Sequence, residues 1–301
     1  MRTLAMTLVL ALSACGGKGP AAYTPPPDAA PTADQAALAA ALEEANGMWA
    51  ARGDESKLMA TLAAYEAILE MDPGNRKALQ RLTRGWYFLG DAHTEDKETK
   101  IERWGTAIEY GARCLALNPD IAQLIQQGEK ERDAVAAATE DDVPCLYWTA
   151  SALGKWGKIQ GLSKTLKHLP TVKAYIGKAE ELNPTFYHYG PARYWGAYYS
   201  VLPSFAGQDL ERSGEYFAAS IEGAPDYLGT RVLRAENLAV ATEDIALFDA
   251  DIQFVLDAPE GIGGSIAPEN EMEKLKAQSL LDRRSELFSR RVIQAADGGM
   301  E

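Results

Sequence analysis

The chain has 301 residues and is strongly acidic, with 43 Asp and Glu residues against 30 Lys and Arg for a net charge of -13. This balance argues against nucleic acid as a partner and against an electrostatic attraction to anionic lipid. The length and the 47% of hydrophobic residues allow one large domain or two small ones with a substantial core.

The N-terminus has the pattern of a bacterial lipoprotein signal. Arg2 precedes an apolar run over residues 4–14, and small residues at its end lead into Cys15. The run is too short for a transmembrane helix, which needs roughly 20 residues. We therefore expect residues 1–14 to be removed and Cys15 to be lipidated, with acyl chains such as palmitate anchoring the protein to a membrane. The alternative is an ordinary signal peptide that happens to contain a cysteine.

The residues after Cys15 predict where the anchored protein lies. Gly16 follows the cysteine, and no Asp stands there to indicate retention at the inner membrane. We therefore expect the outer membrane of a Gram-negative bacterium, with the protein facing the periplasm. Residues 15–33 contain the run Pro25-Pro26-Pro27 among Gly and Ala, which predicts a semi-extended tether.

Residues 34–296 predict one all-α domain, because no run of alternating β-branched residues indicates a strand. Apolar helix tails end repeatedly at a small or polar residue followed by proline, which ends one helix and starts the next. These prolines are Pro73, Pro119, Pro184, Pro225 and Pro259. Their spacings are 46, 65, 41 and 34 residues. A spacing near 34 is typical of tetratricopeptide (TPR) helix pairs, so the longer, uneven spacings predict degenerate repeats with insertions.

The predicted fold class is therefore an α-solenoid, or superhelix, of degenerate TPR-like helix pairs. The charged segment 268–296 has apolar residues at helical spacing and is expected to form a C-terminal capping helix. A helical bundle without repeat order is the alternative.

Two cysteines remain after the anchor, Cys114 and Cys145. In an oxidising compartment they can form a disulfide, but both stand among apolar residues and equally resemble small buried hydrophobic residues. The sequence leaves these alternatives open.

The motifs of catalysis and metal binding are missing from the sequence. The three histidines His93, His168 and His188 are far apart and lack metal-ligand spacing. Neither a GxSxG nor a GxxxxGK[ST] motif occurs. We expect no catalytic residues, no metal and no cofactor, and hence no enzyme.

One stretch, residues 143–241, concentrates aromatic residues, Gly and a few cations. On a helix, Trp148, Ser151 and Lys155 share one face, and the lysine needs an acid or a ligand, with Glu236 as a candidate partner. The aromatic residues either fill the space between stacked helices or line a cavity for an apolar ligand with a polar end. Under the second interpretation the cavity-lining candidates are Trp148, Ser151, Lys155, Trp156, Arg193, Tyr194, Tyr198, Arg234 and Asn237.

The chain resembles the TRAP-transporter-associated TPR lipoproteins, the TatT family. The resemblance covers roughly residues 45–291 and is carried by Tyr147-Trp148-x-Ala150-Ser151-Ala152-Leu153-Gly154-x-Trp156, by Tyr187-x-Tyr189-Gly190-Pro191-x-Arg193 and by residues 231–237. It implies a periplasm-facing helical lipoprotein with an internal hydrophobic channel and a tendency to form homotrimers. The implied partner is the solute-binding protein of a tripartite ATP-independent periplasmic (TRAP) transporter. A TPR scaffold for envelope assembly, binding peptides or proteins, is the alternative function.

Overall fold

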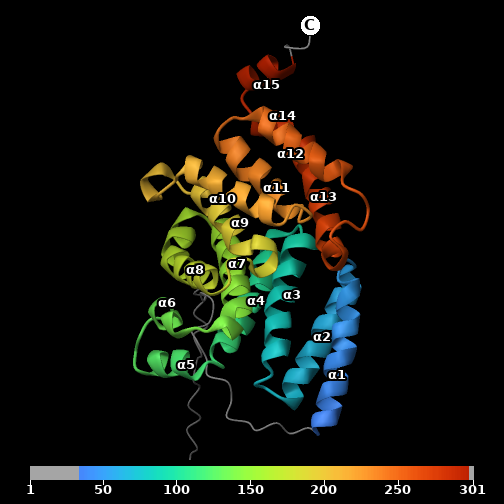
Figure 1. Ribbon diagram of the computed structural model, residues 1–301, viewed down its shortest axis with the longest axis vertical. Coiled ribbons are helices and arrows are strands. Elements are labelled where there is room, and N and C mark those ends of the chain that lie inside the picture. The colour runs from blue at the N-terminus through green and yellow to red at the C-terminus, as the bar shows by residue number, and fades with distance from the viewer. Residues whose placement is uncertain (1–33, 298–301) are drawn as a thin grey trace, which may run out of the picture.

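The computed structural model describes residues 34–297, in which helices are joined by turns and loops and no strand occurs (Figure 1). The expected signal peptide, Cys15 and the proline-rich tether lie outside the described residues. The first helices are α1 Gln35–Met48, α2 Glu55–Met71, α3 Arg76–Ala92, α4 Lys97–Leu115, α5 Pro119–Gln126, α6 Glu131–Ala134, α7 Val143–Gln160 and α8 Leu162–Leu182. They are followed by α9 Phe186–Val201, α10 Leu210–Gly223, α11 Gly229–Leu233, α12 Ile245–Asp257, α13 Ala267–Asp282, α14 Arg284–Leu287 and α15 Arg290–Asp297.

Consecutive helices pack as pairs, and the pairs stack along the long axis of the molecule. Helix α2 packs on both α1 and α3, α3 packs on α4, α7 on α8 and α9 on α10, while α4 joins α7 across the inserted helices α5 and α6. Figure 1 shows the chain progressing from α1 and α2 at one end to α15 at the other. This solenoid-like arrangement confirms the all-α prediction.

The prolines separate the helices as the sequence predicts. Helix α2 ends at Met71, just before Pro73, and α12 ends at Asp257, just before Pro259. Pro119 stands in the first turn of α5, and the side chain of Asn118 caps that helix by accepting hydrogen bonds from the amides of Asp120 and Ile121. Proline fits there because the first amides of a helix have no partner within it.

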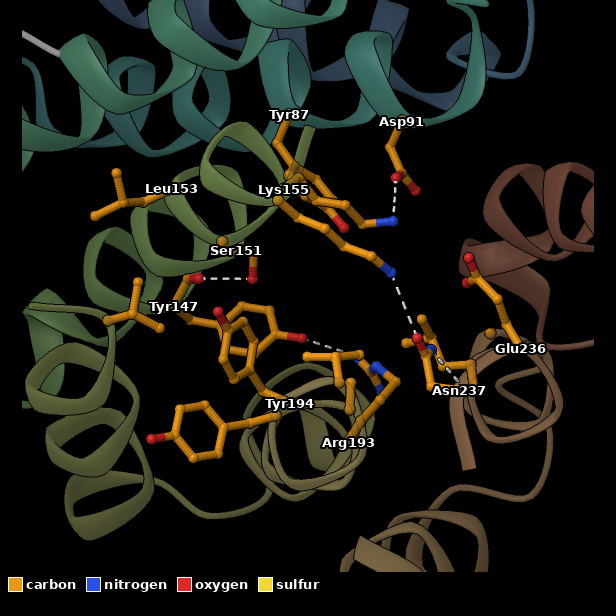
Figure 2. Close-up of a pocket in the computed structure, with 18 of the residues that line it drawn as sticks. Tyr87, Asp91, Tyr147, Ser151, Leu153, Lys155, Arg193, Tyr194, Glu236 and Asn237 are labelled. Carbon is orange, nitrogen blue, oxygen red and sulfur yellow. Dashed lines mark hydrogen bonds and ion pairs between the residues drawn. The ribbon is translucent and has the colours of Figure 1, made fainter. Parts of the chain in front are cut away.

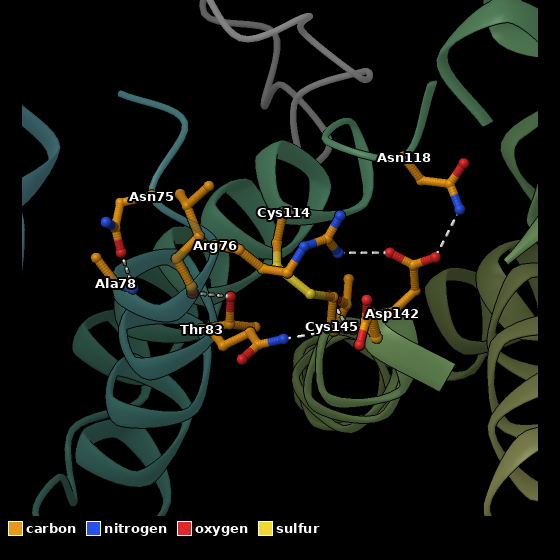
Figure 3. Close-up of a disulfide and its surroundings, with 12 residues drawn as sticks. Asn75, Arg76, Ala78, Thr83, Cys114, Asn118, Asp142 and Cys145 are labelled. Carbon is orange, nitrogen blue, oxygen red and sulfur yellow. Dashed lines mark hydrogen bonds and ion pairs between the residues drawn. A yellow bond between two sulfur atoms is a disulfide. The ribbon is translucent and has the colours of Figure 1, made fainter. Parts of the chain in front are cut away.

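Cys114 and Cys145 are joined by a disulfide that links α4 to α7 (Figure 3). Both cysteines are fully buried. The disulfide and the burial among apolar residues, which the sequence presents as alternatives, therefore occur together. Beside it, the buried carboxylate of Asp142 accepts hydrogen bonds of 2.6 Å from Arg76 and from Asn118. The start of α7 is thereby fixed to α3 and to the α4–α5 junction.

The C-terminal segment forms three helices, α13, α14 and α15, where the sequence predicts one capping helix. The chain leaves α13 at Arg283 and turns extended at Phe288, whose buried ring packs against Phe248 of α12. Helices α11 to α15 share a second apolar core, distinct from the core that the earlier helices form. Burial of Phe288 explains why the helix is interrupted there.

Within residues 34–297, no helix combines the length and the apolar character that crossing a bilayer requires.

Candidate ligand cavity

A cavity of about 350 Å³ lies among α7, α8 and α9, with α3, α11 and α13 contributing to its walls (Figure 2). Side chains from α7, α8, α9 and the residue that follows α9 form an apolar region, which contains Leu153, Leu162, Leu169, Val172, Tyr198, Val201 and Leu202. Aromatic rings and two arginines form a second region, which contains Arg84, Tyr87, Tyr147, Trp148, Tyr187, Arg193, Tyr194 and Tyr227. Charged and amide side chains form a third, which contains Asp91, Lys155, Lys158, Glu236, Asn237, Glu269, Glu273 and Lys276.

The structure brings most of the sequence-predicted site residues to this cavity. Those that line it are Trp148, Ser151, Lys155, Arg193, Tyr194, Tyr198 and Asn237. They come from α7, from α9 and from the segment that follows α11, so residues far apart in sequence meet around one space (Figure 2).

Trp156 and Arg234, the other two predicted residues, do not line the cavity. Trp156 is next to Lys155 and therefore points about 100° away around α7, where it is buried and packs edge-on against His168. Arg234 forms two hydrogen bonds of 2.7 Å with the carboxylate of Asp251 in α12. Both residues stabilise the packing of neighbouring helices.

Asp91 of α3, and not the expected Glu236, is the acid that pairs with Lys155. The Lys155 amine lies 2.8 Å from one carboxylate oxygen of Asp91, and Lys276 of α13 lies 2.6 Å from the other. Burial alone would raise the pKa of Asp91, but the two lysines hold it well below its ordinary value. This ion pair joins α3, α7 and α13 at one wall of the cavity.

A second buried carboxylate, Glu269 of α13, is held by two arginines. Arg52 lies 2.5 Å from one oxygen of Glu269, and Arg84 lies 2.6 Å from the other. Although burial opposes ionisation, the arginines lower the pKa of Glu269. Glu269 and Asp91 are therefore both neutralised by cations within the protein.

Arg193 of α9 is 3% exposed and forms no ion pair with a carboxylate among residues 34–297. Its guanidinium donates to the Tyr147 hydroxyl at 2.9 Å and lies 4.1 Å from the ring centre of Tyr227. Burial alone would lower the pKa of Arg193, but neighbouring tyrosines raise it, so the group is charged. A buried cation that lacks a carboxylate partner and lines a cavity is suited to an anionic group of a ligand.

Arg193 also holds an unusual backbone turn at the start of α9. Tyr187, His188 and Tyr189 have φ values of 46°, 57° and 55°, in the left-handed region that costs residues other than glycine about 1–2 kcal/mol each. The guanidinium donates to the carbonyls of His188 at 2.9 Å and of Tyr187 at 3.2 Å. The turn directs Tyr187 toward Trp148, with ring centres 4.6 Å apart.

A π-helical segment, Arg234–Ala239, follows α11 and places Glu236 and Asn237 at the cavity. Such segments occur often at functional sites, because the extra residue in the turn redirects side chains. Asn237 accepts a long hydrogen bond of 3.5 Å from Lys158, which links α7 to the segment after α11.

Sequence reasoning missed the cavity residues on α3 and α13. Arg84, Tyr87 and Asp91 recur at spacings of three and four and share a face of α3, which places polar groups beside an aromatic ring. The same spacing relates Glu269, Glu273 and Lys276 on α13. This spacing could have indicated that each helix has a polar face. It does not reveal that the two helices, whose contacting residues Asp91 and Lys276 are 185 positions apart, meet at one cavity.

No group of three or more potential metal-ligating side chains converges within residues 34–297. The family model for the TRAP transporter T-component matches residues 55–288, which is most of the chain. The chain belongs to the TRAP transporter T-component family. No match was found among curated protein sequences.

Membership in the T-component family identifies the protein as an accessory component of a TRAP transporter, a role in transport at the cell envelope. It is a family of transporter components and not one of enzymes. The matched residues include every helix that lines the cavity, so the cavity lies within the part of the chain that defines the family.

Proposed function

We propose that this T-component binds the solute-binding protein of its TRAP transporter and takes an amphipathic organic anion into the cavity. The composition of the cavity wall supports an amphipathic anion as the ligand. One region of the wall is apolar, and Arg193 supplies a buried positive charge in another region. An acyl or other apolar chain would lie along α8 and α9, and an acidic head group would reach the guanidinium. Charge-assisted hydrogen bonds to such a group are roughly twice as strong as neutral ones.

The charges that line the cavity support an anion over a cation. Five cations (Arg84, Lys155, Lys158, Arg193 and Lys276) face four acids (Asp91, Glu236, Glu269 and Glu273). Arg52 adds a further cation behind Glu269. The wall is thus positive in a chain whose net charge is -13, so this region opposes the charge of the molecule as a whole.

Isothermal titration calorimetry with dodecanoate and dodecanol tests the ligand, because the two probes share a chain and differ in the charge of the head. We expect dodecanoate to bind at least about tenfold more tightly, which corresponds to about 1.4 kcal/mol. Equal affinity would contradict the role of Arg193, and no binding of either probe would contradict an apolar ligand altogether.

The partner is tested separately by native mass spectrometry of the mature chain with the purified solute-binding protein of its transporter. We expect a complex at micromolar concentrations, and tethering both proteins at one membrane would raise their effective concentration further. Absence of a complex would contradict this part of the proposal without bearing on ligand binding.

The same proposal includes the lipid anchor at Cys15, an outer-membrane location facing the periplasm, and assembly into a homotrimer. The anchor is supported by the signal pattern in residues 1–15. Mass analysis of the membrane-extracted protein tests the acyl chains, and sedimentation velocity of the detergent-free body tests the trimer.

A further inference from the structure

The entrance of the cavity has an exposed apolar rim. Leu162 at the start of α8 and Val201 at the end of α9 both line the cavity, yet they are 48% and 43% exposed. Phe205, in the short helical turn Ser204–Ala206 just beyond, is 77% exposed. Large apolar side chains that are exposed beside a cavity are a feature of interaction sites.

The segment that contributes Leu162 to this rim is rich in lysine and contains no acids. Residues 143–179 contain six lysines and not one Asp or Glu, although the chain as a whole is strongly acidic. Lys155 forms an ion pair with Asp91, and Lys178 forms one with Glu181. Lys158 and Lys167 are exposed, and Lys164 is half-buried. Lys164 lies in the first turn of α8 beside Leu162, whereas Lys167 lies on the side of α8 away from the cavity-lining residues.

Acids near the rim are few and partly engaged. Asp209 and Glu211 follow Phe205, but Asp209 caps α10 by accepting a hydrogen bond from the amide of Arg212, and the Arg212 side chain adds a positive charge. Glu236 lines the cavity and is next in sequence to Asn237, which accepts a hydrogen bond from Lys158. The rim therefore combines exposed apolar side chains with a local excess of positive charge.

We propose that this rim, formed by Leu162, Val201 and Phe205 with Lys158 and Lys164, docks on the surface of an anionic phospholipid bilayer. Apolar side chains would enter the interfacial layer while the lysines contact phosphate groups, as on amphipathic membrane-binding surfaces. Charge complementarity favours this occupant: the lysines are local, so the acidity of the rest of the chain would orient the molecule with the rim toward the lipid.

Docking in this orientation would bring the cavity entrance to the bilayer. An amphipathic ligand could then pass between lipid and cavity without crossing water. The docking proposal depends only on the rim and stands apart from the transporter partner.

The test is flotation of residues 16–301, which lack Cys15 and its expected lipid anchor, with vesicles of equal parts phosphatidylglycerol and phosphatidylcholine, and with phosphatidylcholine alone. We expect binding to the anionic vesicles, weakened by added salt and at least tenfold weaker on phosphatidylcholine. Each basic residue at such a surface contributes about fivefold in binding. Lys164→Gln should therefore weaken binding by about fivefold, and Phe205→Ser should weaken it several-fold.

Matched control variants keep the test specific to the rim. Lys57→Gln removes one exposed lysine on α2, and Leu275→Ser removes an apolar side chain that is 63% exposed on α13. These changes should leave flotation unchanged. Circular dichroism verifies that every variant is folded.

Failure of the unmodified chain to float with anionic vesicles would overturn the proposal, as would equal losses in rim and control variants. If the rim variants weaken the complex with the solute-binding protein while vesicles never bind, the rim belongs to a protein partner and the bilayer proposal is wrong. Dodecanoate binding, measured on the same variants, separates loss of docking from loss of the cavity.

Discussion

At the scale of single residues, the cavity wall depends on a few buried charges that neutralise one another. Asp91 is 11% exposed in its side chain and contacts two lysines from different helices. Removing one charged residue from such a buried group leaves the remaining charges unpaired in the interior. The resulting loss of folding stability exceeds the stability that the complete group contributes.

Asp91→Asn should therefore destabilise the protein at pH 7 by about 3 kcal/mol. The pKa of Asp91 lies well below its ordinary value of 3.8, so its stabilising effect is present above about pH 5 and is lost as the pH falls toward the folded-state pKa. Urea unfolding should show a large loss at pH 7 and a smaller one at pH 3. Asp141→Asn, at an exposed position, is the matched control. Equal losses of stability at the two pH values would contradict the assigned ionisation.

Individual side chains were predictable from sequence only where helix periodicity decided their direction. Trp148, Ser151 and Lys155 share the face that the spacing assigns to them, and all three line the cavity. Spacing within one helix, however, does not identify what lies opposite that face. The acid that meets Lys155 comes from α3, and only tertiary packing brings it there.

At the scale of elements, the left-handed turn that begins α9 shows where tertiary contacts override local preference. Tyr187, His188 and Tyr189 are bulky residues for which right-handed backbone is favoured, and no glycine among them indicates the turn. Ser220 contributes by donating to the carbonyl of Tyr189 at 3.3 Å, in addition to the bonds from Arg193. The sequence predicts a helix here but not this conformation.

Arg193→Lys should loosen this turn, because lysine keeps the charge but cannot reach both carbonyls and the Tyr147 hydroxyl as the guanidinium does. We expect amide hydrogen exchange in residues 187–190 to be at least tenfold faster and dodecanoate binding to weaken by a similar factor. Arg283→Lys, at a position whose side chain is 56% exposed, is the control. Unchanged exchange would show that other contacts hold the turn.

The disulfide between α4 and α7 is a second feature, after the turn of α9, that the sequence alone did not determine. Its cysteines are 31 residues apart, and their approach depends on α5 and α6 folding back between them. The pattern of helices was predictable, but no sequence spacing reports which faces of non-consecutive helices meet.

Replacing both cysteines by alanine should lower the free energy of unfolding by about 3 kcal/mol, because the bond restricts a loop of this length in the unfolded chain. Reduction of the native protein by dithiothreitol should lower it similarly and leave the Cys114→Ala, Cys145→Ala variant unaffected. Denaturant midpoints measured with and without reductant provide the check. A native protein insensitive to reductant throughout unfolding would contradict the contribution of this bond.

At the scale of the whole molecule, the stacked helix pairs leave a space instead of closing into a solid core. Helices α7 to α9 form one side, and α3, α11 and α13 complete the wall. Prolines and helical periodicity predicted the solenoid, since both act locally. The cavity was predictable only in outline, because its closure depends on α13 returning to α3, where Lys276 and Glu269 contact Asp91 and Arg84.

A ligand that binds only the folded state stabilises it by mass action, so the cavity has a measurable thermodynamic signature. Dodecanoate at 100 times its dissociation constant should raise the free energy of unfolding by about 2.7 kcal/mol. Ala197→Phe would place a ring in the cavity from α9, where Ala197 lines the wall, and should abolish this stabilisation while the helix content stays native. Ala218→Phe adds the same ring at an exposed position of α10 and should preserve the effect. Thermal unfolding with and without dodecanoate distinguishes the outcomes: if Ala197→Phe is stabilised as strongly as the native chain, the probe binds elsewhere, and the cavity cannot be the site at which this T-component receives its ligand.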